Sequence, residues 1–199
     1  MFNKYEQIEI IQSIYHYQDT KVIINKLGII DEDLLKQVES DLTQNRLFEL
    51  YEFPIRGRFT MTHLLRIHKH IFQDIYPFAG KIRVEEITKG DTRFHWCHQI
   101  KPQMKKVLLE LKNENYLTGL GDDEFIRRLA YYMSELNIIH PFREGNGRAI
   151  REFIRELALK SDRIIEWQYT DSKKLLNAAI LAVDFDYNLL EDCIRSVLK

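Results

Sequence analysis

The feature that most constrains the fold is a pair of helical segments separated by a short turn near residue 140. Residues 122–139 carry apolar side chains at helical spacing, which predicts an amphipathic helix. Its inward face holds Phe125, Leu129, Met133 and Leu136. Pro141 ends this helix, because a proline disfavours helical backbone in the residue before it. A second helix is expected from near Gly145 to about Lys160, and the pair indicates an α-helical bundle.

Similar spacing predicts further helices on both sides of this pair. The expected segments are residues 21–27 closed by Gly28, 31–50 capped by Asp31, 60–75 capped by Thr60 and ended by Pro77, 101–115, 171–183 and 187–197. Residues 80–100 differ, because Ile82, Val84 and Ile87 are β-branched and a Gly-Asp turn signal follows at residues 90–91. The predicted fold is therefore mainly α, a helical bundle with one short β-hairpin.

Size and charge limit the class of protein. The 199 residues suit a single domain over residues 1–199, and the net charge of −1 gives no basic field that would favour a nucleic acid or a membrane. Cys97 and Cys193 lack metal-type spacing and are expected as free thiols in a reducing compartment. Glu6 and Glu9 interrupt any apolar leader, and no segment is long enough to span a bilayer, so we expect a cytoplasmic protein.

The turn between the two long helices concentrates polar chemistry. His140 lies at the helix end, where an imidazole of ordinary pKa accepts a proton at neutral pH. Glu144 supplies a hard oxygen ligand suited to Mg²⁺ when substrate phosphates provide other ligands. A base and a candidate metal ligand therefore lie four residues apart.

Phosphate-binding groups follow directly. Gly145, Asn146 and Gly147 allow a tight turn whose N–H groups point toward one place at a helix N-terminus, an arrangement that favours anions. Arg148 and Arg151 are three residues apart on the same helix face, and guanidinium groups bind phosphate oxygens in fork geometry. This combination fits nucleotide-dependent transfer onto a hydroxyl.

Plainer interpretations exist for the same residues. A Gly-Asn-Gly sequence between helices is often only a turn, and Arg148 and Arg151 can pair with Glu144 or Glu152 at the surface. His140 and Glu144 resemble a His-x-x-x-Glu metal pair, but the intervening proline prevents one continuous helix from presenting both. The chain lacks the G-x-x-x-x-G-K-[ST] pattern of a P-loop.

A family resemblance favours the chemical interpretation. Residues 140–151 match in full the H-x-F-x-[DE]-G-N-G-R-x-x-R signature of the Fic family. Residues 67–83 resemble the helix that leads into that family's Ala-Gly-Lys-x-Arg segment, and residues 25–29 resemble the N-terminal region of its short bacterial members. The resemblance covers most of the chain and implies the Fic fold.

The resemblance also implies an activity. Fic proteins typically transfer AMP from ATP to a Tyr, Thr or Ser hydroxyl of another protein, although variants use other nucleotides or phosphocholine. By position, His140 would deprotonate the target hydroxyl and Glu144 would hold Mg²⁺. The adenine would lie near the C-terminal helices, without a choice among Asn177, Leu181 and Asp184.

The remaining signature residues would hold the phosphates. The resemblance makes Gly145, Asn146 and Gly147 an anion hole, with Asn146 also using its side chain. It assigns the β-phosphate to Arg148 and the γ-phosphate to Arg151. Since no signature position departs from the pattern, an active nucleotidyltransferase is expected.

The predicted hairpin acquires a role by the same resemblance. In Fic proteins a flap, here about residues 82–96, lies over the active site and pairs with the backbone of the target as an added strand. The candidate docking residues at its tip are Thr88, Lys89, Gly90, Asp91 and Thr92. Without the resemblance, a surface hairpin with a charged tip is the simpler interpretation.

Regulation is expected to involve a second protein. Many Fic proteins carry an inhibitory [ST]-x-x-x-E-[GN] helix, but no Ser or Thr of this chain is followed by Glu four residues later. The resemblance therefore suggests the toxin of a bacterial toxin-antitoxin pair, with a separate small antitoxin whose Glu pairs with Arg151. By analogy the target is a type II topoisomerase subunit. The alternatives are a nucleotide-binding module without transfer activity and a translocated effector that acts on host proteins, although no delivery domain follows residue 199.

Several side chains outside the signature also allow predictions. His68 falls on an apolar helix face and is expected to be buried and hydrogen-bonded. His63 and His70 are expected at the surface. Trp167 and Tyr169 are expected in the core or in a pocket wall.

Overall fold

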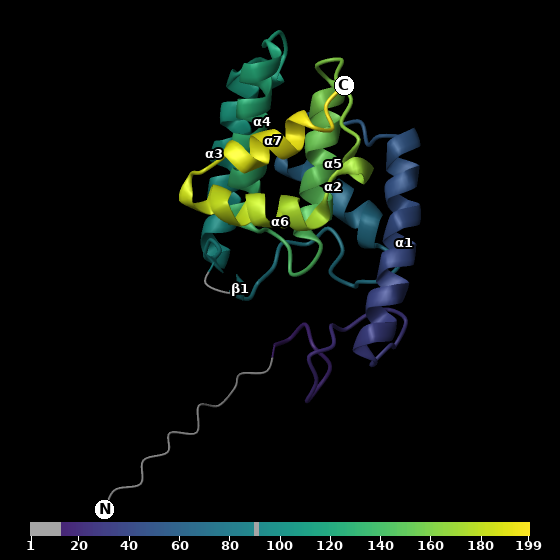
Figure 1. Ribbon diagram of the computed structural model, residues 1–199. Helices are drawn as coiled ribbons and strands as arrows, with labels where there is room; N and C mark the ends of the chain where they lie inside the picture. Colours follow the sequence, from purple (N-terminus) through teal and green to yellow (C-terminus); the bar gives the residue numbers. More distant parts are fainter. Residues whose placement is uncertain (1–12, 90–91) are drawn as a thin grey trace, which may run out of the picture.

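The structure, a computed structural model, describes residues 13–89 and 92–199 of the protein (Figure 1). In these residues it is mainly helical, with a two-stranded antiparallel sheet, as the sequence predicted. The helices are α1 (Glu32–Glu52), α2 (Met61–Phe72), α3 (Cys97–Asn113), α4 (Asp122–Ile139), α5 (Asn146–Leu159), α6 (Ser172–Leu181) and α7 (Asn188–Arg195). The strands are β1 (Thr88–Lys89) and β2 (Thr92–Arg93), and short 3-10 turns are η1 (Asn115–Leu117), η2 (Trp167–Tyr169) and η3 (Ala182–Asp184).

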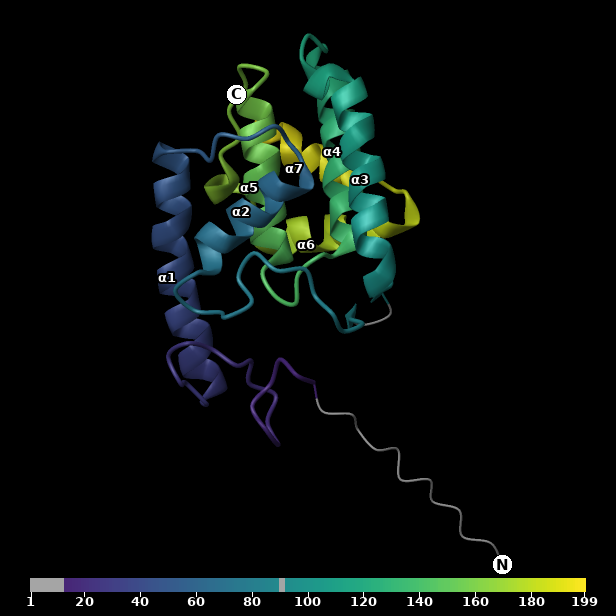
Figure 2. The same cartoon turned by 180° about the vertical axis from the view of Figure 1, so that it is seen from behind.

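The two helices that frame the predicted turn form the centre of the bundle. Helix α4 packs against α3, α5 and α7, while α5 also packs against α2 (Figures 1 and 2). Their facing side chains are fully buried, among them Phe125, Leu129, Phe153 and Ile154. The predicted helix over residues 122–139 has the observed bounds of α4, because its apolar period is long and regular.

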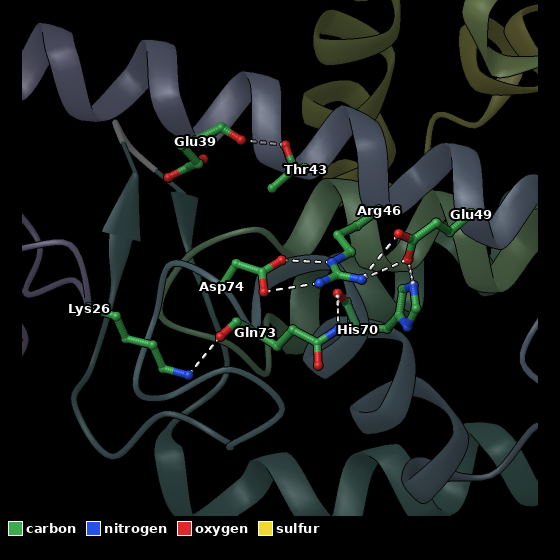
Figure 3. Close-up of polar contacts among 8 residues, drawn as sticks. All are labelled: Lys26, Glu39, Thr43, Arg46, Glu49, His70, Gln73 and Asp74. Carbon is green, nitrogen blue, oxygen red and sulfur yellow. Dashed lines mark hydrogen bonds and ion pairs between the residues drawn. The ribbon is translucent and has the colours of Figure 1, made fainter.

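Helix α1 lies at one side of the bundle and packs on α2 (Figure 1). Asp31 caps it as predicted, because its carboxylate accepts the N–H of Leu34 at 2.8 Å. Figure 3 shows how α1 is fastened: the Arg46 guanidinium binds the Asp74 carboxylate at 2.6 and 3.0 Å and also contacts Glu49. A two-pronged arginine–carboxylate contact fixes orientation as well as distance, so the α1 side chains that face the signature turn are held in place.

The predicted short helix over residues 21–27 is wrong. This segment instead folds back on the chain before it, with an isolated antiparallel bridge between His16 and Ile23. The buried Asn25 side chain donates to the carbonyls of Ile23 and Ile29 and accepts the N–H of Leu27. Asparagine side chains that bond nearby backbone compete with the helical ladder, and this competition prevails here.

Two other helix boundaries differ from prediction. Helix α2 ends at Phe72 rather than near Pro77, and its N-cap residue Thr60 makes no side-chain cap bond. Helix α3 begins at Cys97 rather than near residue 101, because the Glu86 carboxylate accepts the Cys97 N–H at 3.0 Å. A cap supplied from eleven residues upstream, across the hairpin, cannot be found by local sequence rules.

The predicted β-hairpin is present but has short strands. Thr88 pairs with Arg93 and Lys89 with Thr92. The two tip residues at 90–91 lie outside the described part of the chain, as do the leader positions Glu6 and Glu9. In the described parts, no helix combines the length and apolar character that crossing a membrane requires.

Candidate active site

The backbone at the end of α4 determines where the His140 imidazole lies. His140 adopts the left-handed conformation, with φ of 48°, and its ring stacks on Phe94 of the hairpin at a centroid distance of 3.6 Å. Its Nδ1 donates to the carbonyl of Asn137 at 3.1 Å, since a carbonyl can only accept. In the neutral ring Nε2 is therefore a bare acceptor. Burial lowers the pKa of His140 to about 4, which keeps the imidazole neutral at pH 7.

A second histidine, His68, holds the signature turn through a hydrogen bond. His68 is fully buried, as predicted, and stacks on Phe142 at 3.7 Å. Its Nδ1 accepts the N–H of Gly80 at 2.8 Å, so its Nε2 carries the proton and donates to the carbonyl of Glu144 at 2.9 Å. Burial lowers the pKa of His68 to about 4. This neutral imidazole thus joins α2 to the signature turn.

The turn itself is held by Asn146 and by close packing at Gly145. The buried Asn146 side chain accepts the N–H of Phe142 at 2.9 Å and donates to its carbonyl at 2.8 Å. Both polar ends of this side chain are therefore engaged by the chain itself. Gly145 has φ of +80°, and a Cβ there would lie 2.1 Å from the ring of Phe72. The positive φ and the close Phe72 ring both disfavour any residue other than glycine at position 145.

The start of α5 offers backbone donors to an anion. The Gly145 N–H donates to the Glu144 carboxylate at 2.9 Å. The next three N–H groups, of Asn146, Gly147 and Arg148, have no acceptor among the described residues, because they open the helix. Three such donors at the positive end of the helix dipole favour an anion, and we call these three N–H groups the α5 nest.

Arg151 extends the nest on the same side. Its Nη1 lies so close to the turn that a Cβ added to Gly147 would be 3.2 Å away. Burial and the charge of Arg148 both lower the pKa of Arg151. No carboxylate pairs with its guanidinium in the described parts of the chain, and Glu152 pairs instead with Arg155 at 2.7 Å. The cation is partly desolvated and has no carboxylate partner among the described residues, which favours an anionic ligand.

Arg148 has a different environment. It donates from Nη2 to the Glu39 carboxylate and from Nη1 to the Thr43 hydroxyl at 3.2 Å, both on α1. The other oxygen of Glu39 accepts the hydroxyl of Tyr76. The Glu144 carboxylate lies 3.7 Å from the guanidinium. The sequence allows Arg148 to pair with Glu144. In the structure the main partner of Arg148 is Glu39, which the sequence did not suggest.

A cavity of about 640 Å³ joins these elements. It is lined by His140, Gly147 and Arg151, and the hairpin contributes Lys89, Thr92 and Phe94. Glu144 and Arg148 are not among the residues that line it. The structure thus brings the candidate base, Gly147 of the nest and one arginine to one cavity, whereas Gly145 and Asn146 do not line it and the other arginine lies against α1.

Most of the apolar lining of the cavity comes from the C-terminal helices. The apolar lining residues from α6 and η3 are Leu175, Leu176, Ala179, Ile180 and Val183, and Ser172 at the start of α6 adds a hydroxyl. None of Asn177, Leu181 and Asp184, between which the sequence did not decide, lines the cavity. Their neighbours at helical spacing do, so the apolar stripe of residues 175–183 was the signal that could have identified this lining.

Some predictions for the other aromatic and histidine residues are confirmed and others are wrong. Trp167 lines the cavity, as expected, and its Nε1 donates to the Arg151 carbonyl at 2.9 Å, whereas Tyr169 is exposed. The surface position predicted for His63 is wrong. This histidine is buried, and its Nε2 lies 2.7 Å from the Glu156 carboxylate. Histidine is a polar residue type that usually lies at the surface, but here Glu156 of α5 gives His63 a buried partner.

The fold and the site define an α-helical protein with open backbone donors at a helix N-terminus, and with a histidine and a β-hairpin at one cavity. The chain belongs to the Fic/DOC family, whose sequence profile matches residues 58–158.

Comparison with known proteins gives the same assignment. The chain is 39% identical over 181 residues to protein adenylyltransferase VbhT of Bartonella schoenbuchensis. The aligned residues make up 91% of this chain but only 38% of VbhT. It is 38% identical over 157 residues to the probable protein adenylyltransferase Fic of Salmonella typhimurium, over 77% of this chain and 76% of the relative. Its fold matches the crystal structure of BepC from Bartonella tribocorum with bound AMPPNP, with a TM-score of 0.86 and 25% identity over 93% of this chain and 96% of the other.

Proposed function

We propose that this protein is a protein adenylyltransferase that transfers AMP from ATP to a hydroxyl side chain of a target protein. One observation carries the proposal: His140, Gly147 of the α5 nest and Arg151 line a single cavity that is also lined by apolar side chains and by the hairpin. A nucleotide needs an anion site for its phosphates and an apolar surface for its base. Relatives that are named protein adenylyltransferases support the same activity.

His140 acts as the general base in this proposal. Its Nε2 is unprotonated at neutral pH and accepts the proton of the target hydroxyl. The freed oxygen attacks the α-phosphorus of ATP, a new P–O bond forms to the target, and the bond to the β-phosphate oxygen breaks. Pyrophosphate leaves with that electron pair. The proton stays on the imidazole until it passes to product or water.

The α5 nest and Arg151 orient the nucleotide phosphates. The three open N–H groups bind phosphate oxygens and stabilise the charge that develops during transfer. Arg151 binds the terminal phosphate, where its guanidinium replaces lost hydration with charge-assisted hydrogen bonds. Arg148 binds the β-phosphate after exchanging part of its contact with Glu39.

The residues present fit a magnesium ion. Glu144 has a half-exposed carboxylate. Among the described residues it accepts one N–H bond, from Gly145, so its other oxygen is available to a metal ion. No group of three or more His, Cys, Asp or Glu gathers there in the described parts of the chain, so the chain alone cannot enclose a metal. Mg²⁺ commonly takes one carboxylate together with phosphates and water, and it supplies charge neutralisation to phosphoryl chemistry.

The hairpin presents the target. Lys89 and Thr92 line the cavity, and Val84 on the arm before β1 is exposed. An added strand from the target would satisfy backbone groups along this arm and hold its hydroxyl near His140. The docking residues proposed here are Thr88 and Lys89 on one side and Thr92 on the other.

The test compares two positions of label. Purified protein is incubated with a bacterial lysate, Mg²⁺ and ATP labelled at either the α- or the γ-phosphate. We expect α-label, and no γ-label, on one or more lysate proteins. His140→Ala should abolish this label, whereas His98→Ala, at an exposed histidine on α3, should not. γ-Label on protein would show phosphoryl transfer and overturn the proposal.

Two further outcomes separate the alternatives. ATP binding without label on any protein would support a nucleotide-binding module. When the assay is repeated with a host-cell lysate, label on host proteins and none on bacterial proteins would support a translocated effector, the class to which several fold neighbours belong.

A separate inhibitory protein is proposed as the regulator, in a cytoplasmic toxin-antitoxin pair. Arg151 lacks an acidic partner among the described residues, so a glutamate from another chain would find it available. Such a glutamate would compete with the terminal phosphate. We expect a short companion protein with an inhibitory glutamate to suppress labelling, and a type II topoisomerase subunit is the first target to test.

A further inference from the structure

Arg83 lies at the base of the hairpin and has no exposed side-chain surface. It is the largest fully buried side chain among the described residues. Its nearest carboxylate there, of Glu86, is 3.5 Å away and is half-exposed. Burying a cation at such a site is costly unless its N–H groups are all bonded, so its bonding partners identify what it does.

The guanidinium donates to carbonyls from three segments of the chain. Nη1 donates to Glu85 at 2.7 Å on the first hairpin arm, and Nη2 donates to His95 on the second arm. Nε donates to the carbonyl of His140 at 2.8 Å. The backbone N–H of Arg83 also donates to the carbonyl of Pro141 at 2.9 Å. One side chain therefore binds both hairpin arms and the end of α4.

These bonds fix both halves of the stack around the candidate base. His140 has φ of 48°, a left-handed conformation that is unfavourable for a non-glycine residue, and Arg83 binds its carbonyl. His95, whose carbonyl Arg83 also binds, adjoins Phe94, and the Phe94 ring stacks on the imidazole at 3.6 Å. His95 further donates its N–H to Ile138 at 3.1 Å.

We propose that Arg83 is a positioning residue that couples the hairpin to His140. The inference deepens the proposed function, because it concerns how the same site holds its base relative to a docked target. A target strand on the hairpin restrains its arms. Through Arg83 the same restraint reaches the His140 carbonyl, so the accepting Nε2 and the incoming hydroxyl keep one relative position.

The test uses Arg83→Lys as the main variant and Arg83→Met as the second. Lysine keeps the positive charge but has a single ammonium without the planar fork, so it cannot serve the three carbonyls together. Lys81→Met is the matched control. Lys81 is exposed on the same arm, and its replacement by methionine removes one positive charge there. Folding is checked by circular dichroism and thermal melting.

Two readouts are needed. The first separates kcat from KM for ATP in the labelling reaction. The second, independent of activity, is ¹⁵N NMR of the His140 imidazole, which reports its tautomer and titration in each variant.

We expect Arg83→Lys to lower kcat by about 10- to 100-fold, as for a displaced catalytic group, with KM for ATP changed less than about threefold. The His140 ring should lose its single Nδ1–H tautomer and titrate closer to ordinary histidine. Arg83→Met should go further in both respects, and Lys81→Met should match the wild type.

The proposal is overturned if the folded Arg83→Lys protein keeps wild-type kcat and an unchanged His140 signal. Failure of both variants to fold would also count against it, because Arg83 would then be a determinant of folding. Absence of labelling in every protein, with the NMR change present in the variants, would refute the proposed function and leave the coupling in place.

Discussion

The close contact between Gly145 and Phe72 predicts a large effect of one added methyl group. In Gly145→Ala the new Cβ would lie 2.1 Å from Phe72 Cζ, and that ring is fully buried in the core. The φ of +80° adds a left-handed penalty of about 1–2 kcal/mol for alanine. Relieving the overlap by moving packed groups costs about 1–3 kcal/mol more. We therefore expect the free energy of unfolding to fall by about 2–5 kcal/mol.

A matched glycine separates the two contributions. Gly119 has φ of +84°, and a Cβ there would meet nothing within 4 Å. Gly119→Ala should therefore cost only the backbone term of about 1–2 kcal/mol. Urea unfolding followed by circular dichroism measures both variants, and a smaller side chain in Phe72→Leu should reduce the cost of Gly145→Ala in a double-mutant cycle.

Equal destabilisation by the two alanine substitutions would refute this reasoning, since it would show that the Phe72 ring yields at no cost. An additive double-mutant cycle would refute it independently. Labelling activity should fall in Gly145→Ala and stay unchanged in Gly119→Ala, because only the first substitution displaces the α5 nest.

Four further predictions concern other contacts of the site. Because the pKa of His140 is lowered to about 4, kcat/KM for labelling should stay level from pH 8 to about 5 and fall only as pH approaches about 4; an acidic limb near 6.5 would contradict this. The same lowered pKa predicts that this group's contribution to stability is present above about 6.5, where both states are neutral, and declines as pH falls toward about 4, which pH-dependent urea unfolding measures. Asn146→Ala leaves two buried backbone groups of Phe142 unbonded and should lower the free energy of unfolding by about 2–4 kcal/mol in the same assay; a loss below about 1 kcal/mol would show that water replaces the amide. Glu39→Gln removes the anion beside Arg148, so we expect a lower melting temperature but tighter ATP binding by calorimetry, and weaker ATP binding would indicate that Glu39 holds Arg148 ready for the phosphate.

Local rules identified most of the helices and the hairpin, and their errors have physical causes. Residues 21–27 carry a helical pattern, yet the Asn25 side chain bonds the backbone around it. Helix α3 begins early because Glu86 reaches its first N–H from the hairpin. Both effects depend on side chains meeting backbone at particular distances, which residue type and periodicity do not encode.

The sequence by itself determined the family, the helical class and the group of polar residues between His140 and Arg151. It could do so because the signature residues are contiguous and the flanking helices have long, regular apolar periods. Only the tertiary structure decided how those residues are used. It pairs Arg148 with Glu39, leaves Arg151 without an acidic partner in the described chain, and joins the hairpin to His140 through Arg83. These contacts link residues far apart in the chain, and only packing of the helices brings such residues within bonding distance.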